Sequence, residues 1–226
     1  MSFESSSAPR FFVLEKGLLR SRYDVDVNEV EPVNRGEAPR CTRCGDPLGM
    51  LPWLPPYRAE LKLHGEELGD FIKTTGSGFL VSERFAQAFH DESLTGLDGF
   101  QPVEIIRVRR KRGARATTVP HYLAVTVCFG RAAIDVRHSR IRYNKPPTCE
   151  ECRFEGLDAI HGFTLEPGTW QGEEVFRPRG LQGRVVVSER FEHFVAQRGF
   201  TNMRLTPTGE FIWNPLGLNS LPATQP

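Results

Sequence analysis

Four of the five cysteines form two Cys-x-x-Cys pairs, Cys41 with Cys44 and Cys149 with Cys152. Two residues between thiolates let both sulfurs of a tight turn face one ion, and two such turns complete the tetrahedral Cys₄ shell that Zn²⁺ prefers. The spacing therefore predicts one structural zinc ion per chain, bound by these four residues. A four-thiolate shell leaves no position for water or substrate, so the ion is not expected to be catalytic.

Other uses of the thiols stay open. A disulfide framework is disfavoured by the pairwise grouping and by an N-terminus without the basic and apolar segments of a secretory leader. A thioredoxin-like redox site has one Cys-x-x-Cys at a helix start, whereas here there are two, each preceded by a proline, Pro39 or Pro147. An iron–sulfur cluster also takes four thiolates. The fifth cysteine, Cys128, lies in an apolar segment and is predicted to be a small buried side chain.

Basic residues adjoin both pairs. Arg43 and Arg153 place positive charge beside the thiolates, which favours their deprotonation and offsets the negative charge of a zinc–Cys₄ centre. The six histidines are scattered along the chain, and His161, a short distance after the second pair, is the one considered as a neighbour of the metal.

A short repeat links the two Cys pairs. The pentapeptide Val-Ser-Glu-Arg-Phe occurs at residues 81–85 and again at 187–191, an offset of 106 residues, and the Cys pairs are offset by 108. A chance recurrence of one helix start is the alternative, but the matched spacing favours an internal duplication. The sequence therefore predicts two related halves, about residues 10–110 and 111–216, packed around an approximate two-fold axis that brings the Cys pairs together.

The elements expected to position these residues are mostly strands, which indicates a strand-rich α+β fold. Ser82 and Ser188 are each expected to cap a helix that buries phenylalanines on one face. Strands are predicted at residues 11–14, 23–27, 103–108, 119–129 and 132–143, and an irregular loop at 45–58. Residues 10–216 are predicted to form a single domain between flexible tails, residues 1–9 and 217–226.

The composition and the motifs exclude several classes of protein. Of 226 residues, 39% are hydrophobic and 25% charged, which is enough apolar material for a globular core. No run of about 18 apolar residues occurs, so no membrane-spanning helix is expected, and a cytoplasmic location is predicted. The sequence lacks the zinc-protease, nucleophile-elbow and phosphate-loop motifs, so an enzyme is not expected. Asp70, Glu83 and Glu189 are conceivable acid or base groups, but the last two fall in first helical turns, where the helix dipole accounts for them.

Charge is unevenly distributed along the chain. Residues 101–145 contain 11 Lys and Arg and only two acidic residues, whereas the remainder has an acidic excess. A basic hairpin over residues 107–115, followed by Arg137, Arg140 and Arg142, is therefore an alternative candidate for binding nucleic acid through its phosphates. The other interpretation is that these arginines form the solvated edge of a β-hairpin.

The two Cys-x-x-Cys pairs about a hundred residues apart, the first followed by Gly45, resemble the double-CXXCG motif proteins found as many paralogues in myxobacteria. Several of those look like Sit-type immunity proteins, which protect a cell from a toxin delivered by kin. The resemblance implies a protein that binds a cognate protein toxin and neutralises it by stoichiometric occlusion. The second pair departs from the motif, because Arg153 stands where the family has glycine, and a positive φ there costs about 1 kcal/mol.

The uneven charge suggests one kind of toxin. A nuclease has a basic cleft for phosphates, and the acidic surface outside residues 101–145 would complement it. No membrane partner is expected, and the sequence leaves the oligomeric state open.

Overall fold

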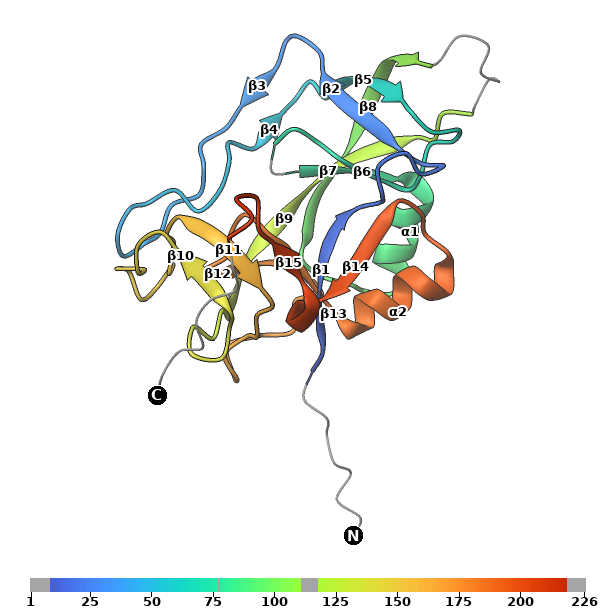
Figure 1. Cartoon of the computed structure of the whole chain (residues 1–226). Helices are drawn as coiled ribbons and strands as arrows, with labels where there is room; N and C mark the ends of the chain where they lie inside the picture. Colours follow the sequence, from blue (N-terminus) through green and yellow to red (C-terminus); the bar gives the residue numbers. More distant parts are fainter. Residues whose placement is uncertain (1–8, 77, 111–117, 219–226) are drawn as a thin grey trace.

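The computed structural model describes residues 9–76, 78–110 and 118–218 of the chain. Strands predominate in these residues, and two α-helices lie together on one side of the sheet (Figure 1). The strands are β1 (Phe11–Lys16), β2 (Val25–Glu29), β3 (Asn34–Arg35), β4 (Trp53–Leu54), β5 (Arg58–Leu63), β6 (Phe71–Lys73), β7 (Gly78–Ser82), β8 (Leu97–Arg109), β9 (Tyr122–Ala133), β10 (Ile141–Tyr143), β11 (Leu157–His161), β12 (Val175–Arg179), β13 (Val185–Ser188), β14 (Met203–Pro207) and β15 (Ile212–Trp213). The helices are α1 (Glu83–Asp91) and α2 (Glu189–Arg198), with a short 3-10 helix, η1 (Thr208–Glu210).

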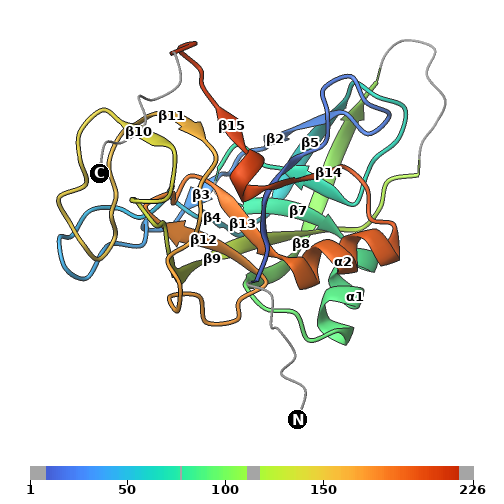
Figure 2. The same cartoon turned by 60° about the horizontal axis from the view of Figure 1, so that its bottom comes forward.

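Ten of these strands form one curled, mixed sheet (Figures 1 and 2). Its main path runs β14-β1-β13-β12-β9-β8-β5-β2, and the β6–β7 hairpin joins it through β7 and β9. The β9–β12 and β5–β8 pairs are parallel, and the other pairs in this sheet are antiparallel. Strand β9 is central, since its first part pairs with β7 and β8 and its end pairs with β12. Two small sheets, β10-β11-β15 and β3-β4, lie beside it.

Both helices begin where the sequence predicts. The hydroxyl of Ser82 accepts the N–H of Phe85, and the hydroxyl of Ser188 accepts that of Phe191, each at 3.3 Å. The helices then pack their phenylalanines together, with the rings of Phe85 and Phe194 5.6 Å apart. These rings and the inner face of the sheet form one apolar core, which stabilises both helices by burial in the way the sequence pattern indicates.

Two further apolar clusters fill the rest of the molecule. One lies between the main sheet and the β10-β11-β15 sheet and includes Phe163 and Phe176. The other lies under β2 and β5 and includes Leu61, Ile72 and Tyr122. The core is therefore divided among several layers, as a curled sheet requires when it is covered on both faces.

One predicted strand, residues 132–143, is wrong. Strand β9 ends at Ala133, and the chain then turns, because the Asp135 carboxylate accepts the N–H groups of Arg137 and His138 at 3.0 and 3.2 Å. Strand β10 follows in a different sheet. An aspartate that bonds to the N–H groups just after it favours a turn over a continuous strand.

Of the remaining sequence predictions, those for the other strands and the loop are confirmed, and those for the tails are not tested. The strand predictions at residues 11–14, 23–27, 103–108 and 119–129 match β1, β2, β8 and β9 apart from their ends, and the 45–58 loop contains only the two residues of β4 and the first residue of β5. Residues 1–8 and 219–226 lie outside the described residues, so the flexible tails stay predictions, as does the single-domain organisation. Neither described helix has the length and apolarity needed to cross a membrane.

The two βα segments, β7–α1 and β13–α2, bond to each other through buried carboxylates. Asp70 directly precedes β6, which pairs with β7. Its carboxylate accepts bonds from the hydroxyl of Ser82 at 2.7 Å and from Nε of Arg84 at 2.6 Å. It also accepts the N–H and the hydroxyl of Thr201, which follows α2, at 2.9 and 2.8 Å. Arg84 in turn donates to the carbonyl of Gly199 at the end of α2, at 3.2 Å. Asp70 and Arg84 thus connect the start of α1 to the end of α2.

Glu174, which directly precedes β12, has the reciprocal role for the β13–α2 segment. Its carboxylate accepts a bond from Nη1 of Arg190 at 2.9 Å, and from the N–H and hydroxyl of Thr95, which follows α1, at 2.9 and 2.8 Å. Arg190 donates to the carbonyl of Glu92 at the end of α1, at 2.6 Å. Each βα segment therefore holds the end of the other helix in place.

These contacts explain the buried carboxylate of Asp70. Burial favours its neutral form, but the hydrogen bonds from Arg84, Ser82 and Thr201 outweigh burial and keep the pKa of Asp70 below its usual value. The group therefore stays ionised at neutral pH as part of the packing between the helices, which is a structural role and not the acid or base role considered from the sequence.

Candidate metal centre

Each Cys pair lies in a tight turn of the same form. The carbonyl of Cys41 accepts the N–H of Gly45, and the carbonyl of Cys149 accepts the N–H of Arg153, each at 2.9 Å. Both turns end in the left-handed region, with φ of 79° at Gly45 and 51° at Arg153. The positive φ considered for Arg153 is therefore present, in a region that favours glycine. We refer to residues 41–45 as the first Cys turn and to residues 149–153 as the second.

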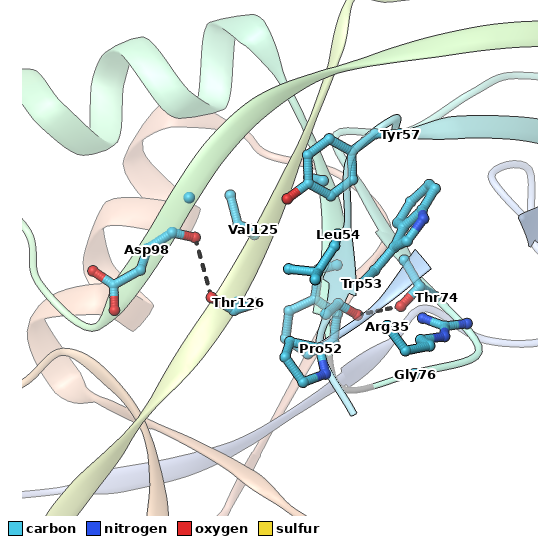
Figure 3. Close-up of a pocket in the computed structure, with 14 residues that line it drawn as sticks. Arg35, Pro52, Trp53, Leu54, Tyr57, Thr74, Gly76, Asp98, Val125 and Thr126 are labelled. Carbon is cyan, nitrogen blue, oxygen red and sulfur yellow. Dashed lines mark hydrogen bonds between the residues drawn. The ribbon is translucent and has the colours of Figure 1, made fainter. Parts of the chain in front are cut away.

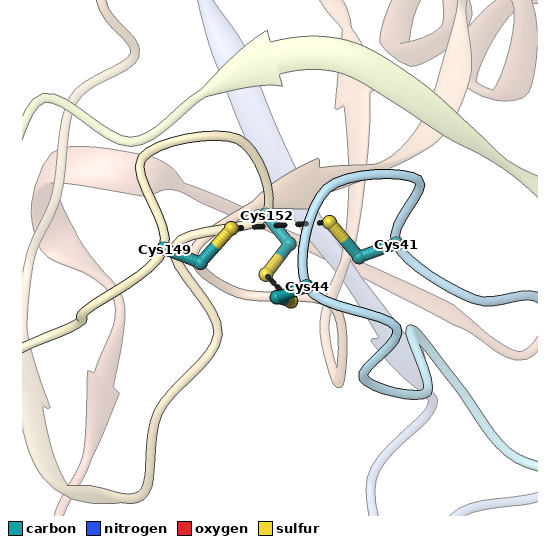
Figure 4. A group of neighbouring side chains, drawn as sticks. All are labelled: Cys41, Cys44, Cys149 and Cys152. Atoms are coloured by element: carbon teal, nitrogen blue, oxygen red, sulfur yellow. Dashed lines mark hydrogen bonds between the residues drawn. The ribbon is translucent and has the colours of Figure 1, made fainter.

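The two Cys turns approach from opposite sides and bring all four sulfurs together (Figure 4). The Sγ atoms lie within 4.8 Å of one another, with 3.9 Å between Cys41 and Cys149 and 3.6 Å between Cys44 and Cys152. A tetrahedral Zn–Cys₄ centre with bonds of about 2.3 Å separates its sulfurs by roughly 3.8 Å. The four thiols are free, and their separations fit a shared metal ion and not disulfides of about 2.05 Å.

The turns favour ionisation of one thiol each. The N–H groups of Cys44 and Arg43 lower the pKa of Cys41, and those of Cys152 and Glu151 lower the pKa of Cys149 to about 7. Metal binding requires deprotonated thiols, so an N–H group that stabilises a thiolate also prepares a ligand. The pKa values of the other two thiols, Cys44 and Cys152, are raised, so the fold prepares one of the two ligands of each turn.

The second Cys turn is bonded to the core of the fold. The carbonyl of Cys152 accepts the N–H of Gly180 at 2.9 Å and the side-chain amide of Gln182 at 2.6 Å. Arg153 donates to the carbonyl of Ile134 at 2.7 Å and pairs with a carboxylate, that of Glu166, at 2.6 Å. Cys152 itself is 2% exposed. Strands β9 and β12 and their loops therefore position this turn.

The first Cys turn is bonded mainly to its own neighbours. Cys41 donates its N–H to the carbonyl of Asp46 at 2.8 Å, and Arg40 donates to the carbonyl of Gly45 at 2.9 Å. Apart from the contacts between the sulfurs, its polar contact with the second turn is an ion pair between Arg43 and Glu150 at 3.0 Å, with both side chains more than 60% exposed. A metal ion would therefore be the strongest link between this turn and the core.

Other residues considered from the sequence lie elsewhere. The two arginines expected beside the thiolates both pair with carboxylates, Arg43 with Glu150 and Arg153 with Glu166. His161 lies in β11 and is not among the residues that cluster with the cysteines in the described part of the chain. Cys128 lies in β9 and is half-buried, not fully buried as predicted. Its thiol donates to the carbonyl of Val175 at 3.4 Å, and partial burial raises its pKa to about 11, so it remains protonated.

The basic segment does not form one surface in the residues that the structure describes. Arg109 of β8 pairs with Glu60 at 2.7 Å, and Arg142 of β10 pairs with Asp158 at 3.5 Å. These strands belong to different sheets. Residues 111–117, most of the predicted hairpin turn, lie outside the described residues. Arg109 and Arg142 thus take part in ion pairs. The solvated-edge interpretation does not hold for Arg109, because β8 pairs with both β9 and β5 and is not an edge strand.

A small pocket of about 200 Å³ lies beside β4 and β7 and is lined by Trp53, Tyr57 and Arg35 (Figure 3). The carboxylate of Asp98, at its far side, is turned away from these residues. Arg35 already pairs with the carboxylate of Glu29. The titratable groups of the pocket therefore do not converge on a common point, as acid–base catalysis would need.

The structure is that of a strand-rich α+β protein with a four-cysteine site. By sequence, the chain belongs to the Imm11 immunity protein family, whose model matches residues 55–210, about two thirds of the chain. None of the curated proteins matches it. The family confirms the expectation of an immunity protein, whereas the closer likeness to double-CXXCG and Sit-type proteins stays a prediction. The matched residues include both βα segments and the second Cys turn, and the first Cys turn precedes them.

Proposed function

We propose that this protein neutralises a cognate protein toxin by forming a stoichiometric complex with it in the cytoplasm. The observation that carries the proposal is membership of an immunity protein family over residues 55–210. Membership also supports a non-enzymatic role, because occlusion needs a rigid complementary surface and no catalytic group.

The four cysteines are proposed to bind one structural zinc ion per chain. Support comes from four sulfurs at separations that suit a tetrahedral ion and from N–H groups that lower the pKa of Cys41 and Cys149. When bound, the ion would join the first Cys turn to the core, since the other polar link is an exposed ion pair between Arg43 and Glu150. The zinc ion would therefore have a structural role, which is to hold the first Cys turn in position.

The internal duplication belongs to this proposal. Ser82 and Ser188 cap their helices in the same way, and Asp70 and Glu174 make reciprocal contacts with the threonines that follow the opposite helices. The Cys turns also share one hydrogen bond and one backbone conformation. Together with the repeated pentapeptide, these features support two related halves and a likeness to double-CXXCG proteins.

A co-expression experiment tests the immunity function. The toxin candidate is the product of the reading frame next to this one, expressed from an inducible promoter with and without this chain. Growth should be restored by the chain, and the two purified proteins should elute as a one-to-one complex. Growth inhibition that the chain does not relieve, with both proteins present in soluble form, would contradict the proposal.

A nuclease is the toxin activity suggested by the acidic excess outside residues 101–145. The purified toxin would then degrade DNA or RNA, and an equimolar amount of the chain would stop the degradation. Retention of nucleic acid by the chain alone, weakened by salt, would instead favour the basic hairpin as a nucleic-acid site.

A further inference from the structure

A cleft of about 970 Å³ lies between the end of β1, the β6–β7 hairpin, the loop before β13 and the segment that follows the first Cys turn. Residues 47–50 and Phe154 form the part nearest the cysteines. Because both segments directly follow the Cys turns, the position of this wall depends on the two turns being held together. The cleft is thus shaped in part by the candidate metal centre.

The cleft has an excess of positive charge. Its lining contains five basic residues and one acidic residue, namely Lys16, Lys73, Arg177, Arg184 and Arg204 with Glu15. Glu15 already pairs with Arg204, and Lys16 pairs with Asp26 outside the cleft at 3.4 Å. Lys73 and Arg184 form no ion pair with any residue in the described part of the chain. The guanidinium of Arg184 lies over the rings of Trp213 and Phe211, with centroids 4.8 and 5.5 Å away, which leaves its charge without a carboxylate partner.

The charges in the cleft are crowded. Burial, followed by repulsion from Arg184 and Arg177, lowers the pKa of Lys73, and burial lowers that of Arg184. Like charges held together without enough carboxylates destabilise the free protein and attract an anionic ligand.

Exposed apolar side chains surround these charges. Leu18 is 64% exposed, Leu19 72%, Met50 60% and Phe154 43%, and all four line the cleft. They make up four of the ten large hydrophobic side chains exposed in the described residues. Exposed apolar side chains that gather around one concave region are typical of a protein-binding surface.

We propose that this cleft is where the toxin binds, and that it receives an acidic segment in which carboxylate side chains lie beside apolar ones. The carboxylates would pair with Lys73 and Arg184, and the apolar side chains would cover Leu18, Leu19 and Met50. This inference rests on the proposed immunity function. It implies that a nuclease toxin would present an acidic loop here and not its phosphate-binding cleft.

A nucleic-acid strand fits the cleft less well. Phosphates suit its cations, but single-stranded nucleic acids also need aromatic side chains on which bases stack. The exposed rim is mostly aliphatic, and Phe154 is its single exposed aromatic residue among those described. Aliphatic rims are covered by the leucine, phenylalanine or methionine of a protein segment.

The first test uses the toxin co-expression assay with charge and rim variants. Lys73→Glu should lose protection and weaken toxin binding about tenfold or more, and Leu19→Asp should do the same by placing a charge on the apolar rim. The matched controls are Arg137→Glu and Leu216→Asp, which alter exposed residues outside the cleft and should protect like the wild type.

The outcomes separate the two proposals. Failure of the wild type to protect contradicts the immunity function, whereas wild-type protection that Lys73→Glu and Leu19→Asp both retain contradicts the cleft. Leu19 is 72% exposed, so Leu19→Asp is expected to fold and keeps the test decisive if Lys73→Glu does not.

The second test needs no toxin. A short synthetic peptide of alternating glutamate and leucine should bind the wild type in fluorescence anisotropy, with about tenfold weaker binding to Lys73→Glu and no change for Arg137→Glu. A peptide with lysine in place of glutamate should not bind. Binding of a single-stranded oligonucleotide at the cleft, without binding of the acidic peptide, would overturn the inference in favour of nucleic acid.

Discussion

The two Cys turns share a backbone conformation but differ in how the fold supports them. The second turn bonds to the loop after β12 through the carbonyl of Cys152, and to Ile134, directly after β9, through Arg153. The first turn bonds mostly within itself, and its Cys44 is exposed. A metal ion would therefore complete a site whose second half is bonded to the core, and would link to it a first half that has fewer bonds to the rest of the fold.

The residues after the two pairs show the same difference. A Cβ at Gly45 would meet no heavy atom within 4 Å. The positive φ of 79°, and not a lack of space, is therefore the reason that glycine is favoured there. Arg153 adopts φ of 51° in spite of its side chain. Its guanidinium bonds to the carbonyl of Ile134 and to the carboxylate of Glu166, which offsets the backbone strain.

The largest expected effect comes from removing one sulfur ligand from each turn. Cys152→Ser should abolish metal binding and lower the free energy of unfolding by several kcal/mol, because it also leaves a polar group at a buried position. Cys44→Ser should lose metal with a smaller loss of stability, since Cys44 is exposed. Metal content by mass spectrometry and thermal unfolding measure the two effects, with Cys128→Ala as a variant outside the site. Equal destabilisation by both variants would contradict the conclusion that the fold supports the second Cys turn more strongly than the first.

The second prediction concerns the reciprocal βα contacts. Asp70→Asn should lower the free energy of unfolding by roughly 1–3 kcal/mol, because it weakens the bonds to Arg84 and Thr201. The pKa of Asp70 is lowered in the folded state, so its stabilisation is complete above the unfolded value of about 3.9 and is lost as the pH falls through the folded value.

Urea denaturation between neutral and acidic pH measures that dependence. The difference in stability between the wild type and Asp70→Asn should shrink as the solution becomes more acidic than the unfolded pKa. A constant difference over the whole range would show that the charge of Asp70 does not contribute.

A smaller effect on stability is expected from substitutions at the last residue of each Cys turn, which is glycine in the first turn and arginine in the second. Gly45→Ala should cost about 1 kcal/mol, because alanine has to adopt positive φ although space is available for its Cβ. Thermal unfolding at saturating zinc is the measurement. Arg153→Gly is the counterpart, and it should change stability less than Arg153→Ala, which keeps the strain and loses the same side-chain bonds.

The smallest effect is expected from removing the ion pair that joins the two Cys turns. Arg43→Ala removes the exposed ion pair with Glu150 and should change the free energy of unfolding by less than about 1 kcal/mol, the usual range for exposed pairs. A loss of several kcal/mol in the metal-bound protein would mean that this pair, and not the metal, joins the turns.

Local sequence patterns were sufficient for the features that depend on near neighbours. A serine followed by a helical apolar pattern predicted the caps at Ser82 and Ser188, and the Cys-x-x-Cys spacing predicted four sulfurs that the fold does bring together. The turn at Asp135 was missed because its apolar neighbours also suit a strand. Strand β12 gave little signal, since Val175–Arg179 contains two arginines and a proline.

The contacts between distant segments depended on the tertiary structure. The sequence did not indicate that Glu174 would bond to the threonine after the opposite helix, as Asp70 does. Yet the separation between Asp70 and Glu174 along the chain is nearly the same as that between the two copies of the pentapeptide. Lys73 and Arg184 are isolated basic residues in the sequence, and they share a cleft because β6 and the loop before β13 are brought to the same side of the sheet.

The sequence by itself determined the chemistry available to this protein: four thiols in two turns, two capped helices and a strand-rich core. Each follows from interactions within a few residues, which a linear pattern records. The tertiary structure decided which turn is bonded to the core, which carboxylates are buried and where the unbalanced positive charge lies. Those properties depend on burial and on distances between segments more than a hundred residues apart, and both arise only when the sheet curls and closes.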